Sequence, residues 1–148
     1  TSLDEVYNRG GIKMGKDNII DFNASIRLKI VEDDFKHDKN VVAVTGAIRP
    51  ELKEEWNKLY DLELKNYEES GALDCRFINM KPYLLSLLFN LTSGVTVAEA
   101  WEMFECLDLP EEIQKTAVAL AIKFSPRGND LRLHIIRKNA RKNIRIAR

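Results

Sequence analysis

The spacing of apolar residues changes at Pro50, and this change constrains the fold more than any other feature. Between Ile19 and Val31 an apolar side chain occupies every second position, which is typical of a strand with one buried face. Residues Val41–Ile48 are rich in β-branched types and predict a second strand. The polar stretch 32–40 would join the two strands. We therefore predict an antiparallel β-hairpin before Pro50.

From Pro50 onwards the apolar spacing is helical. A proline is well placed to open a helix, because the N–H that it lacks needs no partner in the first turn. Apolar stripes and a capping box predict further helices over residues 82–91, 96–107 and 111–124. Residues 131–148 fit a helix better than a strand, since only the first few of them alternate. The predicted fold class is α+β, mainly α, with an N-terminal β-hairpin packed on four to five helices.

The charges are unevenly distributed along the chain. The 148 residues suit one domain, and their 23 basic and 23 acidic side chains cancel. From Lys115 to the end, however, ten basic residues face a single acid, Asp130, whereas the first 114 residues carry 13 basic and 22 acidic side chains. We predict an acidic globular body over residues 1–128, made of the hairpin and helices. A basic segment over residues 129–148 would belong to the same domain or form an arm.

The basic segment predicts nucleic-acid binding, because spaced cations release the counterions condensed on a phosphate backbone. Arginine predominates in it, and its planar guanidinium suits bidentate phosphate contacts. An apolar stripe would dock the helix on the body: Leu133, Ile136, Ala140, Ile144 and Ala147. The residues expected to contact RNA or DNA are Lys123, Arg127, Arg132, Arg137, Lys138, Arg141, Lys142, Arg145 and Arg148. We expect a non-enzymatic protein with little base specificity, although a solvated helix or one docked on its own acidic helices would fit the same pattern.

The alternative function is self-assembly. Residues 82–114 contain six acidic side chains and no lysine or arginine. The acidic residues are Glu99, Glu102, Glu105, Asp108, Glu111 and Glu112. If the basic segment of one copy docks on this acidic surface of the next, the contact is head-to-tail and builds rings or filaments. A homo-oligomer is expected in that case, and it could bind nucleic acid as well.

Other classes of function find little support in the sequence. No motif combines a nucleophile, a base and an oxyanion site, and we expect neither an enzyme nor a cofactor nor a metal. No apolar run approaches the 18 or so residues that span a bilayer, so no membrane partner is expected. The two cysteines, Cys75 and Cys106, lack metal-binding spacing. So few cysteines favour the cytoplasm or another reducing compartment.

Overall fold

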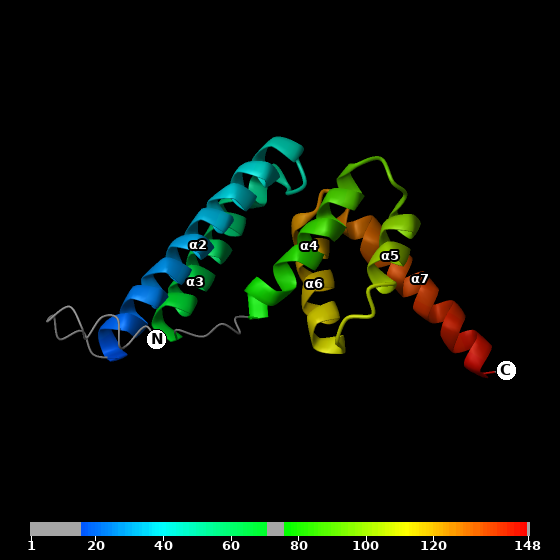
Figure 1. The fold of residues 1–148 in the computed structure, drawn as a ribbon. Coiled ribbons are helices and arrows are strands. Elements are labelled where there is room, and N and C mark those ends of the chain that lie inside the picture. Colours follow the sequence, from blue (N-terminus) through cyan, green and yellow to red (C-terminus); the bar gives the residue numbers. More distant parts are fainter. Residues whose placement is uncertain (1–15, 71–75, 148) are drawn as a thin grey trace, which may run out of the picture.

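The computed structural model describes residues 16–70 and 76–147, and every regular element in these two ranges is helical (Figure 1). The elements are α2 (Lys16–Thr45), the 3-10 helix η1 (Pro50–Leu52), α3 (Lys53–Ser70), α4 (Arg76–Thr92), α5 (Val97–Glu105), α6 (Glu111–Phe124) and α7 (Gly128–Ala147). No strand occurs in these ranges. The predicted α+β class is therefore wrong, since this part of the chain is all helical.

The predicted N-terminal β-hairpin is replaced by one long helix. α2 runs without interruption through both predicted strands and the predicted loop, and it contains neither glycine nor proline to break it. Its buried and half-buried side chains recur at steps of three and four residues, which is helical spacing. They include Leu28, Val31, Phe35, Asp38 and Val42.

The alternation in residues 19–31 gave a wrong strand prediction because its apolar residues do not share one buried face. Ile26 is 45% exposed and Ile30 is 62% exposed. The stretch 32–40, predicted as a polar loop, instead holds Phe35 and Asp38, two of the most buried side chains of α2. Burial by tertiary packing thus overrides the local two-residue period.

The helix boundaries follow the predicted signals more closely. Gly46 follows α2 with a φ of 70°, a left-handed conformation that glycine adopts without strain and that commonly ends helices. Pro50 opens η1, which leads directly into α3. Thr96 caps α5, because its side-chain oxygen accepts a hydrogen bond of 3.1 Å from the backbone N–H of Glu99. The predicted helix starts at Pro50 and near Thr96 are confirmed. The start predicted at residue 82 is wrong, because α4 begins at Arg76 and contains Pro82 in its interior.

A single core joins the α2–α3 pair to the other four helices. Aromatic rings meet edge-on across the junction: the ring of Phe35 lies 4.9 Å from that of Tyr60, and Tyr60 lies 5.1 Å from Phe77. Trp56 of α3 contacts Phe124 of α6 with 5.0 Å between ring centres. Edge-to-face pairs of this kind add stability beyond the apolar area that they bury. The described helices therefore share one hydrophobic cluster.

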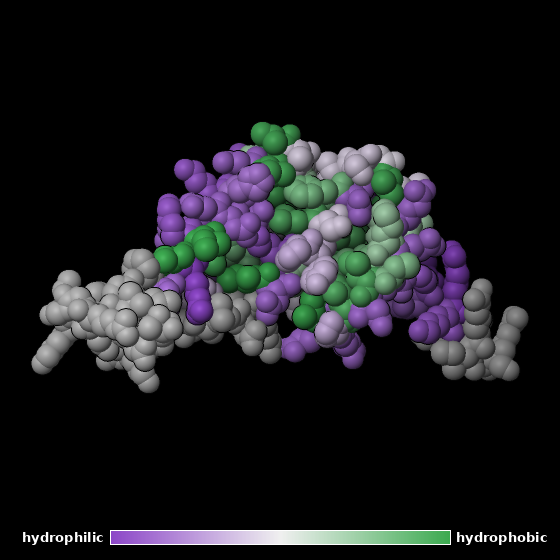
Figure 2. Space-filling model, in the orientation of Figure 1, coloured by the Kyte–Doolittle hydropathy of each residue, from purple (hydrophilic) through white to green (hydrophobic). Residues whose placement is uncertain are grey.

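α7 lies partly within this arrangement and partly beyond it. Its N-terminal half packs against α5 and α6. Its C-terminal half, red in Figure 1, projects past them. The surface around that projecting half is hydrophilic in Figure 2. Within residues 16–70 and 76–147, no helix has an apolar stretch long enough to cross a membrane.

Candidate functional site

The first turns of α7 anchor it to the body. Leu131 is fully buried and Ile135 is half-buried, whereas residues 136–142 are all exposed. Gly128 opens the helix where the chain passes so close to α6 that a Cβ would lie 1.9 Å from the carbonyl oxygen of Ile122. Of the predicted docking stripe, Leu133 is half-buried, whereas Ile136 is 50% exposed and Ala140 is exposed. The side chains of Ile144 and Ala147 lie outside the described residues.

Two of the predicted phosphate-binding residues are engaged within the chain. The Arg127 guanidinium donates to the backbone carbonyl of Val95 at 2.8 Å and lies 3.4 Å from that of Leu91, so it closes the end of α4. The Lys123 ammonium forms an ion pair with the Glu55 carboxylate of α3. The structure therefore gives Arg127 and Lys123 contacts within the fold.

A third basic residue, Lys138, pairs with the Glu105 carboxylate at the end of α5. The sequence was also compatible with docking of the basic segment on the chain's own acidic helices, and this contact is an instance of such docking. It accounts for one side chain of α7 rather than for the whole segment. Both groups remain partly exposed, so the pair adds little stability on its own.

Four of the predicted cations on α7 are exposed and have no ion-pair partner in the described part of the chain: Arg132, Arg137, Arg141 and Lys142. Arg137 and Arg141 lie four residues apart, one turn of helix, and hence on the same side of α7. Arg132 precedes Arg141 by nine residues, about two and a half turns, and lies on the opposite side. The remaining two predicted residues are not placed: the side chain of Arg145 and the whole of Arg148 lie outside the described residues.

The predicted acidic surface is also present, and part of it is paired internally. All six acidic side chains are exposed. Glu105 pairs with Lys138, and Glu111 pairs with Lys115 at 2.8 Å. Among residues 16–70 and 76–147, nothing pairs with the carboxylates of three others: Glu99, Glu102 and Asp108.

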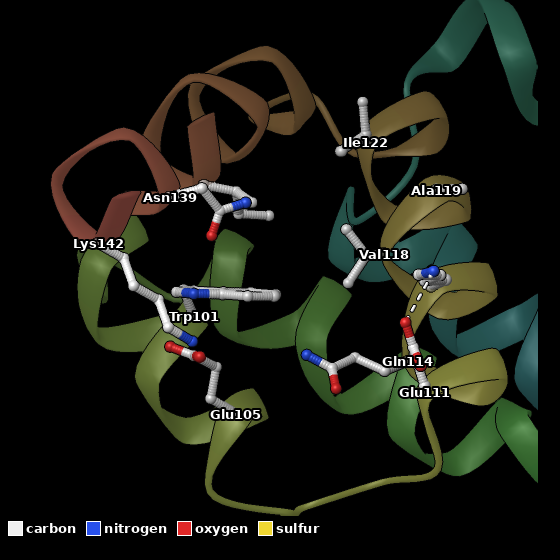
Figure 3. Close-up of a pocket in the computed structure, with 11 residues that line it drawn as sticks. Trp101, Glu105, Glu111, Gln114, Val118, Ala119, Ile122, Asn139 and Lys142 are labelled. Carbon is white, nitrogen blue, oxygen red and sulfur yellow. Dashed lines mark ion pairs between the residues drawn. The ribbon is translucent and has the colours of Figure 1, made fainter. Parts of the chain in front are cut away.

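A hollow of about 590 Å³ lies between α5, α6 and α7, beside the Lys138–Glu105 pair (Figure 3). Its apolar wall is formed by Trp101, Val118, Ala119, Ile122 and Ile135. Polar groups at its rim are those of Glu105, Glu111, Gln114, Lys115, Asn139 and Lys142. The sequence analysis did not predict this hollow. The one signal in the sequence that could have indicated the hollow is the set of polar residues at helical spacing from Trp101.

A buried ionic cluster was missed as well. Lys81 of α4 donates to the carboxylates of Asp34 and Asp38 on α2, and the side chains of Lys81 and Asp38 are only 8% and 11% exposed. Burial lowers the pKa of Lys81, but the two carboxylates raise it more, so the pKa lies above its ordinary value and the amine stays charged. Burial raises the pKa of Asp38 against the opposing effect of Lys81. A lysine inside the apolar run 80–85 was the available signal.

Metal chemistry and family membership give no further guidance. No group of histidine, cysteine, aspartate and glutamate side chains within residues 16–70 and 76–147 is arranged to hold a metal ion. Comparison with known proteins finds no match: no family model, no curated protein and no solved structure is significantly similar to the chain. The function must be argued from the site alone.

Proposed function

We propose that the chain binds nucleic acid through the phosphate backbone, using the exposed basic side of α7. The observation that carries the proposal is the pair Arg137 and Arg141. They lie one turn apart on the projecting part of the helix, and no carboxylate of the described chain neutralises them. Lys142 is exposed beside Arg141 and adds a third cation. Arginine forks at this spacing suit contacts to successive phosphates.

The internal contacts narrow the nine predicted residues to a smaller set. Lys123, Arg127 and Lys138 have partners within the fold, so they are proposed to position the helix rather than to bind. Arg132 lies on the opposite side of α7 from Arg141 and is proposed to stay out of the contact. The binding surface proposed here is therefore formed by Arg137, Arg141 and Lys142.

The test is a salt titration of binding to a labelled single-stranded oligonucleotide, followed by fluorescence anisotropy. Affinity should fall steeply with salt, because each neutralised phosphate contributes about −0.7 to the logarithmic slope. The double variant Arg137→Gln/Arg141→Gln should reduce the magnitude of that slope by about 1.4. It should also weaken binding by a similar factor for unrelated base sequences, since phosphates carry no sequence information.

Arg132→Gln is the matched control for the single variant Arg141→Gln, because it removes one positive charge from the opposite side of the same helix. Its slope and affinity should stay close to those of the unmodified chain. Failure to bind at low salt would overturn the proposal. An equal loss in Arg132→Gln would show that net charge matters and the row of Arg137 and Arg141 does not.

A second candidate is self-assembly, and one observation favours it. The exposed side of α7 also presents Ile136 and Ala140, an apolar row with no cover in the described chain. The unpaired carboxylates of Glu99 and Glu102 on another copy offer a complementary charge. Light scattering over a range of salt concentrations tests this candidate. The mass should fall at high salt and in Ile136→Ser, whereas a constant monomer mass would exclude it.

We place this activity in the cytoplasm or another reducing compartment. Cys106 is an exposed free thiol, and a thiol of this kind persists best where disulfides are kept reduced. Labelling of Cys106 by a thiol reagent in protein isolated without reductant tests this placement.

A further inference from the structure

We infer that the hollow between α5, α6 and α7 receives a base of single-stranded nucleic acid while the adjoining side of α7 holds the phosphates. The inference rests on the proposed function and adds to it the class of ligand: a single strand with accessible bases rather than a duplex. It also predicts that part of the binding free energy does not depend on charge.

The first argument is the chemistry of the hollow. Its volume of about 590 Å³ falls within the range of about 300–1,000 Å³ that is usual for small-molecule sites. The wall is apolar and includes Trp101, which is itself packed on Phe104 with 5.8 Å between ring centres and therefore held rigidly. A flat, largely apolar group such as a nucleobase is suited to such a wall.

The second argument is the charge of the rim. Its two acids and two lysines balance, and Glu111 is paired with Lys115 at 2.8 Å. The hydrogen bond and charge of Lys115 lower the pKa of Glu111, so this carboxylate stays ionised. Because both carboxylates are neutralised by lysines, the rim has no net positive charge to attract a phosphate, and it admits a neutral group. The charged backbone of the ligand must therefore stay outside the hollow.

The third argument is the presence of two polar groups that can read a base edge. The amides of Asn139 and Gln114 lie around the Trp101 ring (Figure 3) and form no hydrogen bond to any other residue of the described chain. A side-chain amide has donors and an acceptor side by side, and this pattern matches the edge of a base. Bases in a duplex are paired and stacked, so only a single strand can supply one without an opening cost.

The fourth argument is continuity with the basic side of α7. A second hollow, of about 500 Å³, lies next to the first and is lined by Glu105, Lys138, Asn139, Arg141 and Lys142. The two hollows share the side chains of Glu105, Asn139 and Lys142. A nucleotide whose base lies in the first hollow would thus have its phosphate beside Arg141 and Lys142.

The decisive experiment compares a single-stranded oligodeoxynucleotide with an abasic oligomer of the same length and phosphate number. We expect the intact strand to bind at least about fivefold more tightly than the abasic strand at the same salt concentration, the lower limit for one stacked base. A duplex of the same length should bind no more tightly than the abasic strand. Fluorescence anisotropy with the full chain measures all three.

Ala119→Phe blocks the hollow without disturbing the core, because Ala119 belongs to the wall on α6 and is exposed. The variant should bind the intact strand only as tightly as the abasic one, and its affinity for the abasic strand should not change. Ala43→Phe is the matched control, since Ala43 is an exposed alanine of α2. Asn139→Ala, an exposed position, provides a second variant that removes a base-reading amide without adding bulk.

The outcomes separate this inference from the proposed function. If neither strand binds, the proposed function fails. If both strands bind equally and Ala119→Phe changes nothing, the phosphate contacts stand and the base site is overturned. If Ala119→Phe instead lowers the mass measured by light scattering while both affinities persist, the hollow receives another copy of the chain, and the base site is again overturned.

Discussion

Replacement of Lys81 by methionine is expected to destabilise the fold strongly. Methionine has a similar length, so packing against the ring of Phe35 should be largely kept. What is lost is the only ion-pair partner of Asp38 in the described part of the chain, and the Asp38 side chain is 11% exposed. Removal of one partner from a buried pair typically costs about 3–5 kcal/mol, because the other charge remains buried and unpaired.

Asp34, the other carboxylate that pairs with Lys81, provides a variant with which the loss of stability can be compared. The Asp34 side chain is 53% exposed, so water can solvate it once the lysine is gone. Asp34→Asn should therefore cost at most about 1 kcal/mol. The same calculation predicts that Lys81→Met combined with Asp38→Leu recovers most of the loss, since no buried charge then remains.

Equilibrium urea unfolding, followed by circular dichroism at pH 7, measures these differences. With a slope of about 2 kcal/mol per molar urea, the midpoint of Lys81→Met should fall by about 2 M. A loss below about 1 kcal/mol would refute the reasoning that Asp38 is a buried charge. A double variant as unstable as Lys81→Met would show that the lysine stem, rather than its charge, stabilises the junction.

The pH dependence of the same variant follows from the two pKa directions. In the folded chain the pKa of Lys81 is raised above 10.5, so the stability contributed by its charge is present below that pH and is lost as the pH rises through the folded value. The pKa of Asp38 is raised above 3.8 by burial, so its protonated form favours the folded state as the pH falls. The deficit of Lys81→Met should thus shrink at strongly alkaline pH and again on acidification. A deficit independent of pH would contradict both directions.

Three further predictions concern stability, and thermal or urea unfolding checks each of them. Thr96→Ala should cost about 1 kcal/mol, because the N–H of Glu99 loses its capping partner. Gly128→Ala should cost about 2–4 kcal/mol, because the new Cβ would lie 1.9 Å from the backbone oxygen of Ile122, which cannot move aside as a side chain would. Tyr60→Phe should leave stability unchanged or raise it by about 1 kcal/mol, because the buried Tyr60 hydroxyl has no protein partner in the described part of the chain. A marked loss in Tyr60→Phe would instead show that the hydroxyl is hydrogen-bonded.

Much of the second half of the fold was predictable from the sequence because its signals are local. The Thr96 cap and the proline at position 50 act within one turn of helix, and both place helix starts where the structure has them. α2 could not be predicted in the same way. Its stripe continues through a polar stretch, and one of the stripe positions is filled by Asp38. An aspartate at a core position is consistent with a helix only once Lys81, 43 residues further along the chain, is known to face it.

The candidate site shows the same division between local and tertiary information. The sequence identified the basic residues of α7, and the structure determines which of them remain available. The row that faces the body passes from Leu131 and Ile135 to Lys138 and Lys142, at steps of four, three and four residues. The change from apolar to basic occurs at the level of Glu105, where the core ends.

The change from apolar to basic residues along this row explains how a chain of zero net charge can keep a cationic surface. Lys138 continues the row of Leu131 and Ile135 and neutralises Glu105, while the burial of Leu131 fixes the rotation of α7 about its axis. With that rotation fixed, Arg137 lies about 100° around the helix from Lys138 and Arg141 about 60°. Neither arginine has an ion-pair partner in the described part of the chain. Reversing the pair by Lys138→Glu with Glu105→Lys should therefore keep both the fold and the affinity for a single strand, whereas Lys138→Glu alone should loosen α7 and weaken binding by more than the loss of one phosphate contact would explain. Equal affinities for the single and the double variant would show that Lys138 binds phosphate itself and does not orient the arginines.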